Sequence, residues 1–209
     1  MDLPKDLRFL LDQRHRAMDH DQHHRLLPIH RQSIYRALDA KNIWQQNQGR
    51  ARLALVTARY VFPIWEQRWK EDNLMPQILA TAEMFIEGTI PLQEARSIAF
   101  TGSTYLEDLG EGGLPSDSQL SAFFAGDTIV CALYEVIGIR PFDKLRLDVT
   151  TTDEDLDPYV SDSPQWAASA VTDYLRNSPE DIVKRQRLWT WWLLEAIPLA
   201  WHSSMSPAT

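Results

Sequence analysis

Histidines near the N-terminus are the residues whose type and spacing most suggest metal chemistry. Five of the six lie within the first 30 residues, namely His15, His20, His23, His24 and His30. On a helix, His20 would share a face with His23 or His24, and imidazoles at that spacing can bind one metal ion. Zincin enzymes have a glutamate directly after the first histidine, whereas Asp21 follows His20. Because the segment is rich in charged residues, we expect a solvated face and no bound metal. A metal-dependent helical enzyme that uses these histidines stays as an alternative.

Carboxylates cluster at residues 153–157, in the sequence Asp-Glu-Asp-Leu-Asp. Calcium-binding loops place carboxylates at the same first, third and fifth positions, but they also need glycine at the sixth and glutamate at the twelfth. Pro158 and Pro164 occupy those two positions. The sequence therefore predicts no calcium site at this run.

The other residues capable of catalysis do not form a recognisable motif. Cys131 is the single cysteine and lies among apolar residues, a setting that raises thiol pKa and disfavours a nucleophilic role. P-loop, dinucleotide-binding, zinc-finger and serine-elbow patterns are missing. Glu66 and Glu195 could pair as acid and base, but they lack a nucleophile or metal to act with. We therefore expect a protein that is not an enzyme and that uses no cofactor.

A tryptophan-rich helix is predicted at residues 178–198. Ser178 suits the N-cap and Pro179 the first helical position, while Pro198 should disturb or end the helix. Trp189 and Trp192 lie in a stretch that is apolar on nearly all sides, which is typical of a helix enclosed by others. We expect at least six helices packed around it, with both rings buried.

The remaining chain also shows helical periodicity, interrupted by glycine, proline and short polar segments. Pro63 is expected to kink or split its helix. Residues 145–149 could be a loop or a short strand. The sequence therefore predicts one all-α domain over residues 1–209, a multi-helix bundle or short helical array. Within it we expect a peripheral helical hairpin at 1–45, an acidic loop at 139–162, and helices at 5–20, 26–40, 50–70, 73–88, 91–105, 116–138, 163–177 and 178–198.

Charge is unevenly distributed along the chain. The formal net charge is −8, yet residues 97–209 carry 17 Asp/Glu against 7 Lys/Arg. Such a surface repels nucleic acid and attracts basic partners, although it can also serve solubility alone. No apolar run approaches the length of a membrane span, and the N-terminus lacks the pattern of a secretory signal. With a single cysteine, these features favour a cytoplasmic protein.

Three segments resemble an all-α family of bacterial immunity proteins from polymorphic toxin systems. Residues 51–66 form a helix of small residues that leads into Phe-Pro-Ile-Trp-Glu. Residues 86–90 (Ile-Glu-Gly-Thr-Ile) and the tryptophan-rich stretch 185–198 fit the same layout. The resemblance covers about half of the chain, and its motifs mostly describe packing. It implies a protein that binds and neutralises a cognate toxin.

Toxins that act on nucleic acid, such as nucleases, are commonly basic, and an acidic inhibitor could cover such an active site. We therefore expect the partner to contact Asp153, Glu154, Asp155, Asp157, Glu107, Asp108 and Glu111. These positions are expected to lie in solvated loop or surface. A helical scaffold or adaptor with another partner is the main alternative.

Overall fold

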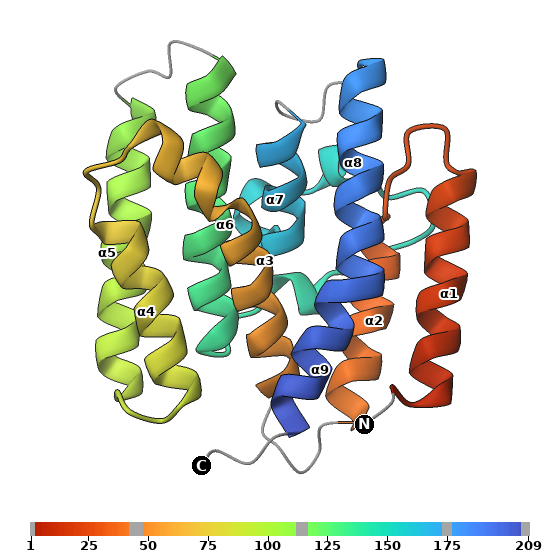
Figure 1. The fold of residues 1–209 in the computed structure, drawn as a ribbon, viewed down its shortest axis with the longest axis horizontal. Helices are drawn as coiled ribbons and strands as arrows, with labels where there is room; N and C mark the ends of the chain where they lie inside the picture. The colour runs from red at the N-terminus through yellow and green to blue at the C-terminus, as the bar shows by residue number, and fades with distance from the viewer. Residues whose placement is uncertain (1–2, 42–47, 112–116, 173–176, 206–209) are drawn as a thin grey trace.

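The computed structural model describes residues 3–41, 48–111, 117–172 and 177–205. These residues form helices joined by turns and loops, with no strand among them, which confirms the all-α prediction. The longer helices run roughly side by side along one direction (Figure 1). They are α1 (Lys5–His20), α2 (Pro28–Lys41), α3 (Gln48–Arg68), α4 (Leu74–Ile86), α5 (Leu92–Glu111), α6 (Asp117–Val136), α7 (Ser163–Val171), α8 (Pro179–Trp191) and α9 (Ile197–Met205).

Helices α3 and α6 form the most extensive helix–helix contact of the bundle. Gly126 permits it, because a Cβ at this position would lie 2.6 Å from the Trp65 ring on α3 and 2.8 Å from Leu106 on α5. Gly102 on α5 similarly allows close approach to Ile78 and to α6. The buried apolar side chains of these helices belong to one continuous core.

Several helix boundaries follow the expected local signals. Asp72 accepts hydrogen bonds from the backbone N–H groups of Leu74 and Met75 (3.1 and 3.3 Å), so it caps α4. Gly88 has a φ of +74° directly after α4, a conformation that glycine adopts without strain. Pro63 lies inside α3, and the helix continues past it to Arg68, so the expected split does not occur.

The tryptophan-rich helix differs from its prediction in two ways. Trp189 and Trp192 are buried as expected, with 1% and 0% exposure. However, Pro198 does not end the helix, because a π-helical turn (η4, Trp192–Ala196) precedes it and α9 continues to Met205. The wider turn avoids the clash that proline causes with a carbonyl four residues earlier. Val183 and Leu194 are also exposed, so one side of this helix faces solvent and the bundle is centred on α3 and α6 instead.

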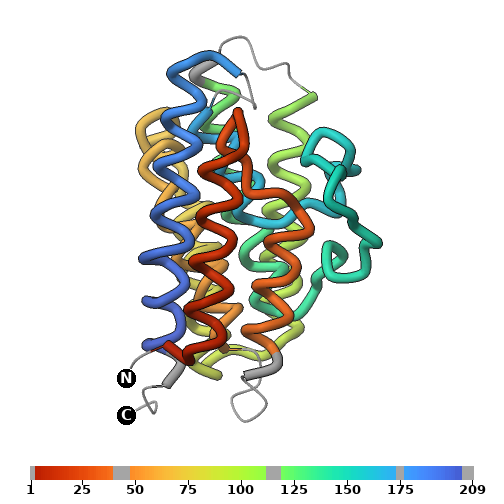
Figure 2. Tube along the Cα trace, turned by 90° about the vertical axis from the view of Figure 1, so that its right-hand side faces the viewer, coloured from red at the N-terminus to blue at the C-terminus, as the bar shows by residue number. Residues whose placement is uncertain are grey.

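The segment 139–162 forms three short 3₁₀ helices, and residues 145–149 are loop and turn, not strand. Figure 2 shows the segment wound over one side of the bundle, next to α2. The 3₁₀ helices are η1 (Pro141–Lys144), η2 (Asp153–Asp155) and η3 (Pro158–Val160). In the described part of the chain, no helix is long and apolar enough to cross a membrane.

Candidate functional site

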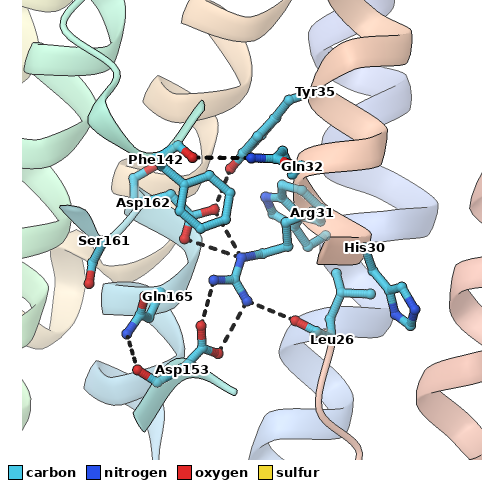
Figure 3. A network of polar contacts seen from close by, with 12 residues as sticks. Leu26, His30, Arg31, Gln32, Tyr35, Phe142, Asp153, Ser161, Asp162 and Gln165 are labelled. Atoms are coloured by element: carbon cyan, nitrogen blue, oxygen red, sulfur yellow. Dashed lines mark hydrogen bonds and ion pairs between the residues drawn. The ribbon is translucent and has the colours of Figure 1, made fainter. Parts of the chain in front are cut away.

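A buried arginine, Arg31, binds two aspartates of the acidic segment 139–162 and so holds this segment against the bundle (Figure 3). Arg31 on α2 is fully buried and its Nε donates to both carboxylate oxygens of Asp162, at 3.1 and 2.9 Å. Its Nη1 and Nη2 donate to Asp153 at 3.1 and 2.6 Å, and Nη1 also donates to the Leu26 carbonyl at 2.7 Å. Burial alone would lower the pKa of Arg31, but the two carboxylates hold it above its ordinary value.

Neighbouring polar residues of α2 complete this attachment. The Tyr35 hydroxyl donates to Asp162 at 2.8 Å, and its ring packs edge-on against Phe142 with 6.0 Å between centroids. Gln32 donates to the carbonyls of Phe142 and Leu145, at 3.3 and 3.1 Å. Residues 139–162 are therefore part of the folded structure along much of their length, which is a correction to the expected solvated loop.

The carboxylates of residues 153–157 consequently differ in what they can contact. Asp153 is held by Arg31, with a side-chain exposure of 10%, so its expected place on an open surface is wrong. Asp155 forms a capping box with Thr152 at η2. Asp157 is exposed and caps η3 by accepting a backbone N–H. Glu154 is exposed and its side chain caps no helix, so of these four carboxylates it is the most available for contact with a partner.

The second expected acidic group lies on the solvent side of α5. Glu107, Asp108 and Glu111 are all exposed. Glu107 differs from the other two because it also borders a cavity between α5 and α6. The structure thus brings one of the expected contact residues to a concave site.

This cavity, here called the Asp127 pocket, has a volume of about 560 Å³. One face of α6 forms a wall, since its lining residues recur at helical spacing from Phe123 to Asp127, Val130, Cys131 and Tyr134. Opposite walls come from α5, η1, η3 and the start of α7.

The position of Asp127 is chemically unusual. Its side chain lines the pocket and is otherwise enclosed, and burial raises its pKa to about 7. No charged group contributes to that shift. Among the described residues, the carboxyl has no hydrogen-bonding or ion-pair partner. A carboxyl in this setting can change protonation state near neutral pH, and an incoming cation would favour its ionised form.

Two other ionisable groups of the pocket are already bound. Glu135 is buried and accepts the backbone N–H of Ser163 at 2.7 Å, and burial raises its pKa. Burial likewise raises the pKa of the Cys131 thiol, which contacts Glu135 Oε1 at 3.6 Å and the Ser161 carbonyl at 3.5 Å. The thiol is therefore protonated at neutral pH and is a poor nucleophile.

The histidines are dispersed among separate contacts. α1 ends at His20, and His24 has a φ of 50° in the turn that follows, so the helical spacing assumed for them is wrong. His20 Nδ1 lies 2.8 Å from the Arg16 carbonyl, and His15 Nε2 lies 3.3 Å from Thr190 Oγ1. His30 is half-buried, and burial lowers its pKa to about 4. Within the described ranges, no three His, Cys, Asp or Glu side chains are arranged to hold a metal ion.

Sequence reasoning missed Arg31, Asp162 and Asp127. The Arg31 network joins residues 131 positions apart, and no local pattern predicts such a pair. Asp127 did leave a signal, because it interrupts a largely apolar helix and no Lys or Arg occurs between Arg96 and Arg140. A charged residue on an apolar helix face without a nearby counter-ion is a candidate functional residue.

Comparison with known families identifies one family whose model matches most of the chain. The family model described as immunity protein Imm5 matches residues 11–199, which includes every helix that lines the Asp127 pocket and both ends of the Arg31 network. No curated protein matches the chain. The match confirms the resemblance to immunity proteins seen in residues 51–66 and 185–198. The chain belongs to the Imm5 immunity protein family.

Proposed function

We propose that this protein protects a bacterial cell by binding a cognate protein toxin and blocking its activity, without chemistry of its own. The observation that carries the proposal is the match of an immunity family over residues 11–199. The side chains best suited to catalysis are engaged in structural contacts, Cys131 and Glu135 in the pocket wall and His15 and His20 along α1. Binding alone is sufficient for neutralisation.

Charge supports a basic partner, such as a nuclease that acts in the cytoplasm. The exposed carboxylates of α5 and of η2 and η3 lie in the half of the chain with 17 acidic and 7 basic residues. Charges at the rim of an interface mainly accelerate encounter, whereas buried contacts determine how long the complex lasts. We therefore assign these carboxylates to the attraction of the toxin, and expect other, buried contacts to determine how long the complex lasts.

Co-expression tests the proposal. A candidate toxin, sought among the genes that flank the gene for this protein, is produced in bacteria from an inducible promoter, with and without the present chain. We expect growth to be rescued and the two proteins to co-purify in a fixed ratio. The variant Trp192→Ala, which removes a fully buried ring, serves as a destabilised control. Toxin activity that persists beside abundant, folded wild-type protein would exclude neutralisation.

A further inference from the structure

We propose that the Asp127 pocket receives an arginine or lysine side chain of the toxin. The inference rests on the proposed function and adds the contact that anchors the complex. The exposed lining of the pocket walls is mostly apolar, and of the enclosed carboxylates there only that of Asp127 lacks a hydrogen-bonding or ion-pair partner among the described residues. The aliphatic stem of arginine or lysine suits such walls, and the cationic group suits the carboxylate.

The absence of a counter-ion is the first argument. A buried carboxylate is ordinarily paired, because desolvation without compensation costs free energy. Arg31 is paired in this way with Asp153 and Asp162, whereas Asp127 has no such partner among the described residues. An incoming cation would supply one.

The two arginines that line the pocket are engaged by other groups, so neither serves as the counter-ion of Asp127. Arg50 is paired with Asp143 at 2.6 Å, and Arg140 donates to the Glu135 carbonyl at 3.0 Å, so neither cation is directed to Asp127. The ionisable groups that line the pocket are Arg50 from α3, Glu107 from α5, Asp127, Cys131, Tyr134 and Glu135 from α6, Arg140 before η1, Tyr159 in η3 and Asp162 before α7.

Access to the pocket is the second argument. Tyr159 at the rim is 85% exposed, and Glu107 on the facing helix is also exposed. A basic protein surface drawn to Glu107 and the neighbouring Asp108 would meet the pocket opening. The volume of about 560 Å³ would also admit a free organic cation, and the experiment must separate these two occupants.

The first arm of the experiment uses the protein alone and n-butylguanidinium, which reproduces the arginine stem and head. Binding is followed by NMR at the indole N–H of Trp166, a pocket residue, with neutral n-butylurea as the matched probe. We expect saturable binding of the cation and much weaker binding of the urea. Because a proton competes for the carboxylate, affinity should fall about tenfold from pH 8 to pH 6 for a pKa near 7. Equal binding of the two probes would overturn the inference, and so would an affinity for n-butylguanidinium that does not depend on pH. Both results come from the wild-type protein alone.

The second arm measures affinity for the toxin that the co-expression experiment identifies. Asp127→Asn keeps the shape of the side chain and should weaken binding by at least about tenfold at pH 8. Glu94→Gln, at an exposed position in the first turn of α5 and away from the proposed contact carboxylates, is the matched control and should change affinity less than about twofold.

The outcomes distinguish the two proposals. Toxin binding by wild type that is unaffected in Asp127→Asn overturns this inference and leaves the proposed function intact. Strong binding of n-butylguanidinium together with that result would assign the pocket to a free cation. Failure of wild type to bind the toxin overturns the proposed function, and this inference with it.

Discussion

Arg31→Met removes the cation that holds two aspartates in the interior, and we expect it to be among the most destabilising single changes in this protein. Arg31 donates to Asp162, Asp153 and the Leu26 carbonyl, and both Arg31 and Asp162 are buried. After the substitution, Asp162 would retain the Tyr35 hydroxyl but no positive charge. Removing one member of a buried ion pair costs about 3–5 kcal/mol, because the remaining charge is uncompensated.

That loss is a large part of the roughly 5–15 kcal/mol by which domains are stable. With a urea m-value of about 2 kcal/mol/M, the midpoint of unfolding should fall by about 1.5–2.5 M. The assay is urea denaturation at pH 7, followed by tryptophan fluorescence. Arg59→Met is the matched control, because Arg59 pairs with Glu83 at the surface and should lose less than about 1 kcal/mol. A loss below about 1 kcal/mol for Arg31→Met would show that the network does not hold the acidic segment 139–162 to the bundle.

Three further predictions concern the pocket, the core and the charged rim. Burial raises the pKa of Asp127 from 3.8 to about 7, so the folded state binds this proton more tightly and the associated stability is lost as pH rises from about 4 to about 7. Asp127→Asn should therefore stabilise the protein by on the order of 3–4 kcal/mol at pH 8 and by little at pH 4; equal effects at both pH values in thermal melts would argue against the raised pKa. Trp192→Ala should cost about 3–5 kcal/mol in chemical denaturation, since a fully buried ring is lost, and a cost under about 1 kcal/mol would mean that the site refills. Changing Glu107, Asp108 and Glu111 together to Gln or Asn should slow association with the toxin about tenfold at low salt and much less at 1 M salt, whereas an unchanged on-rate across a salt series would exclude steering by this rim.

The helical framework could be predicted because its signals are local. Ser178 accepts the N–H of Asp181 at 3.1 Å at the start of α8, and Gly88 adopts a positive φ after α4. Burial of Trp189 and Trp192 followed from the apolar composition of their segment. The π-helical turn at 192–196 was not predictable in the same way, because it depends on how the chain accommodates a proline within a packed bundle.

The site was harder to predict because its parts are distant in sequence. The carboxylates of residues 153–157 were recognised as a group, but their sequence could not show that Arg31, 122 positions before Asp153, would bury one of them. Glu107 was identified by charge alone, and its position at the border of the Asp127 pocket depends on the packing of α5 against α6. A carboxylate within an apolar helix was the one signal in the sequence that pointed to the pocket.

Neutralisation by binding is tested most directly by a titration of toxin activity with this protein. A candidate toxin, sought among the genes that flank the gene for this protein, is held at a fixed concentration, and its activity and complex formation are measured together as the folded chain is added. If the protein neutralises the toxin by binding, activity falls in step with complex formation and is abolished once every toxin molecule is bound. Full toxin activity in the presence of excess folded protein would contradict neutralisation by binding.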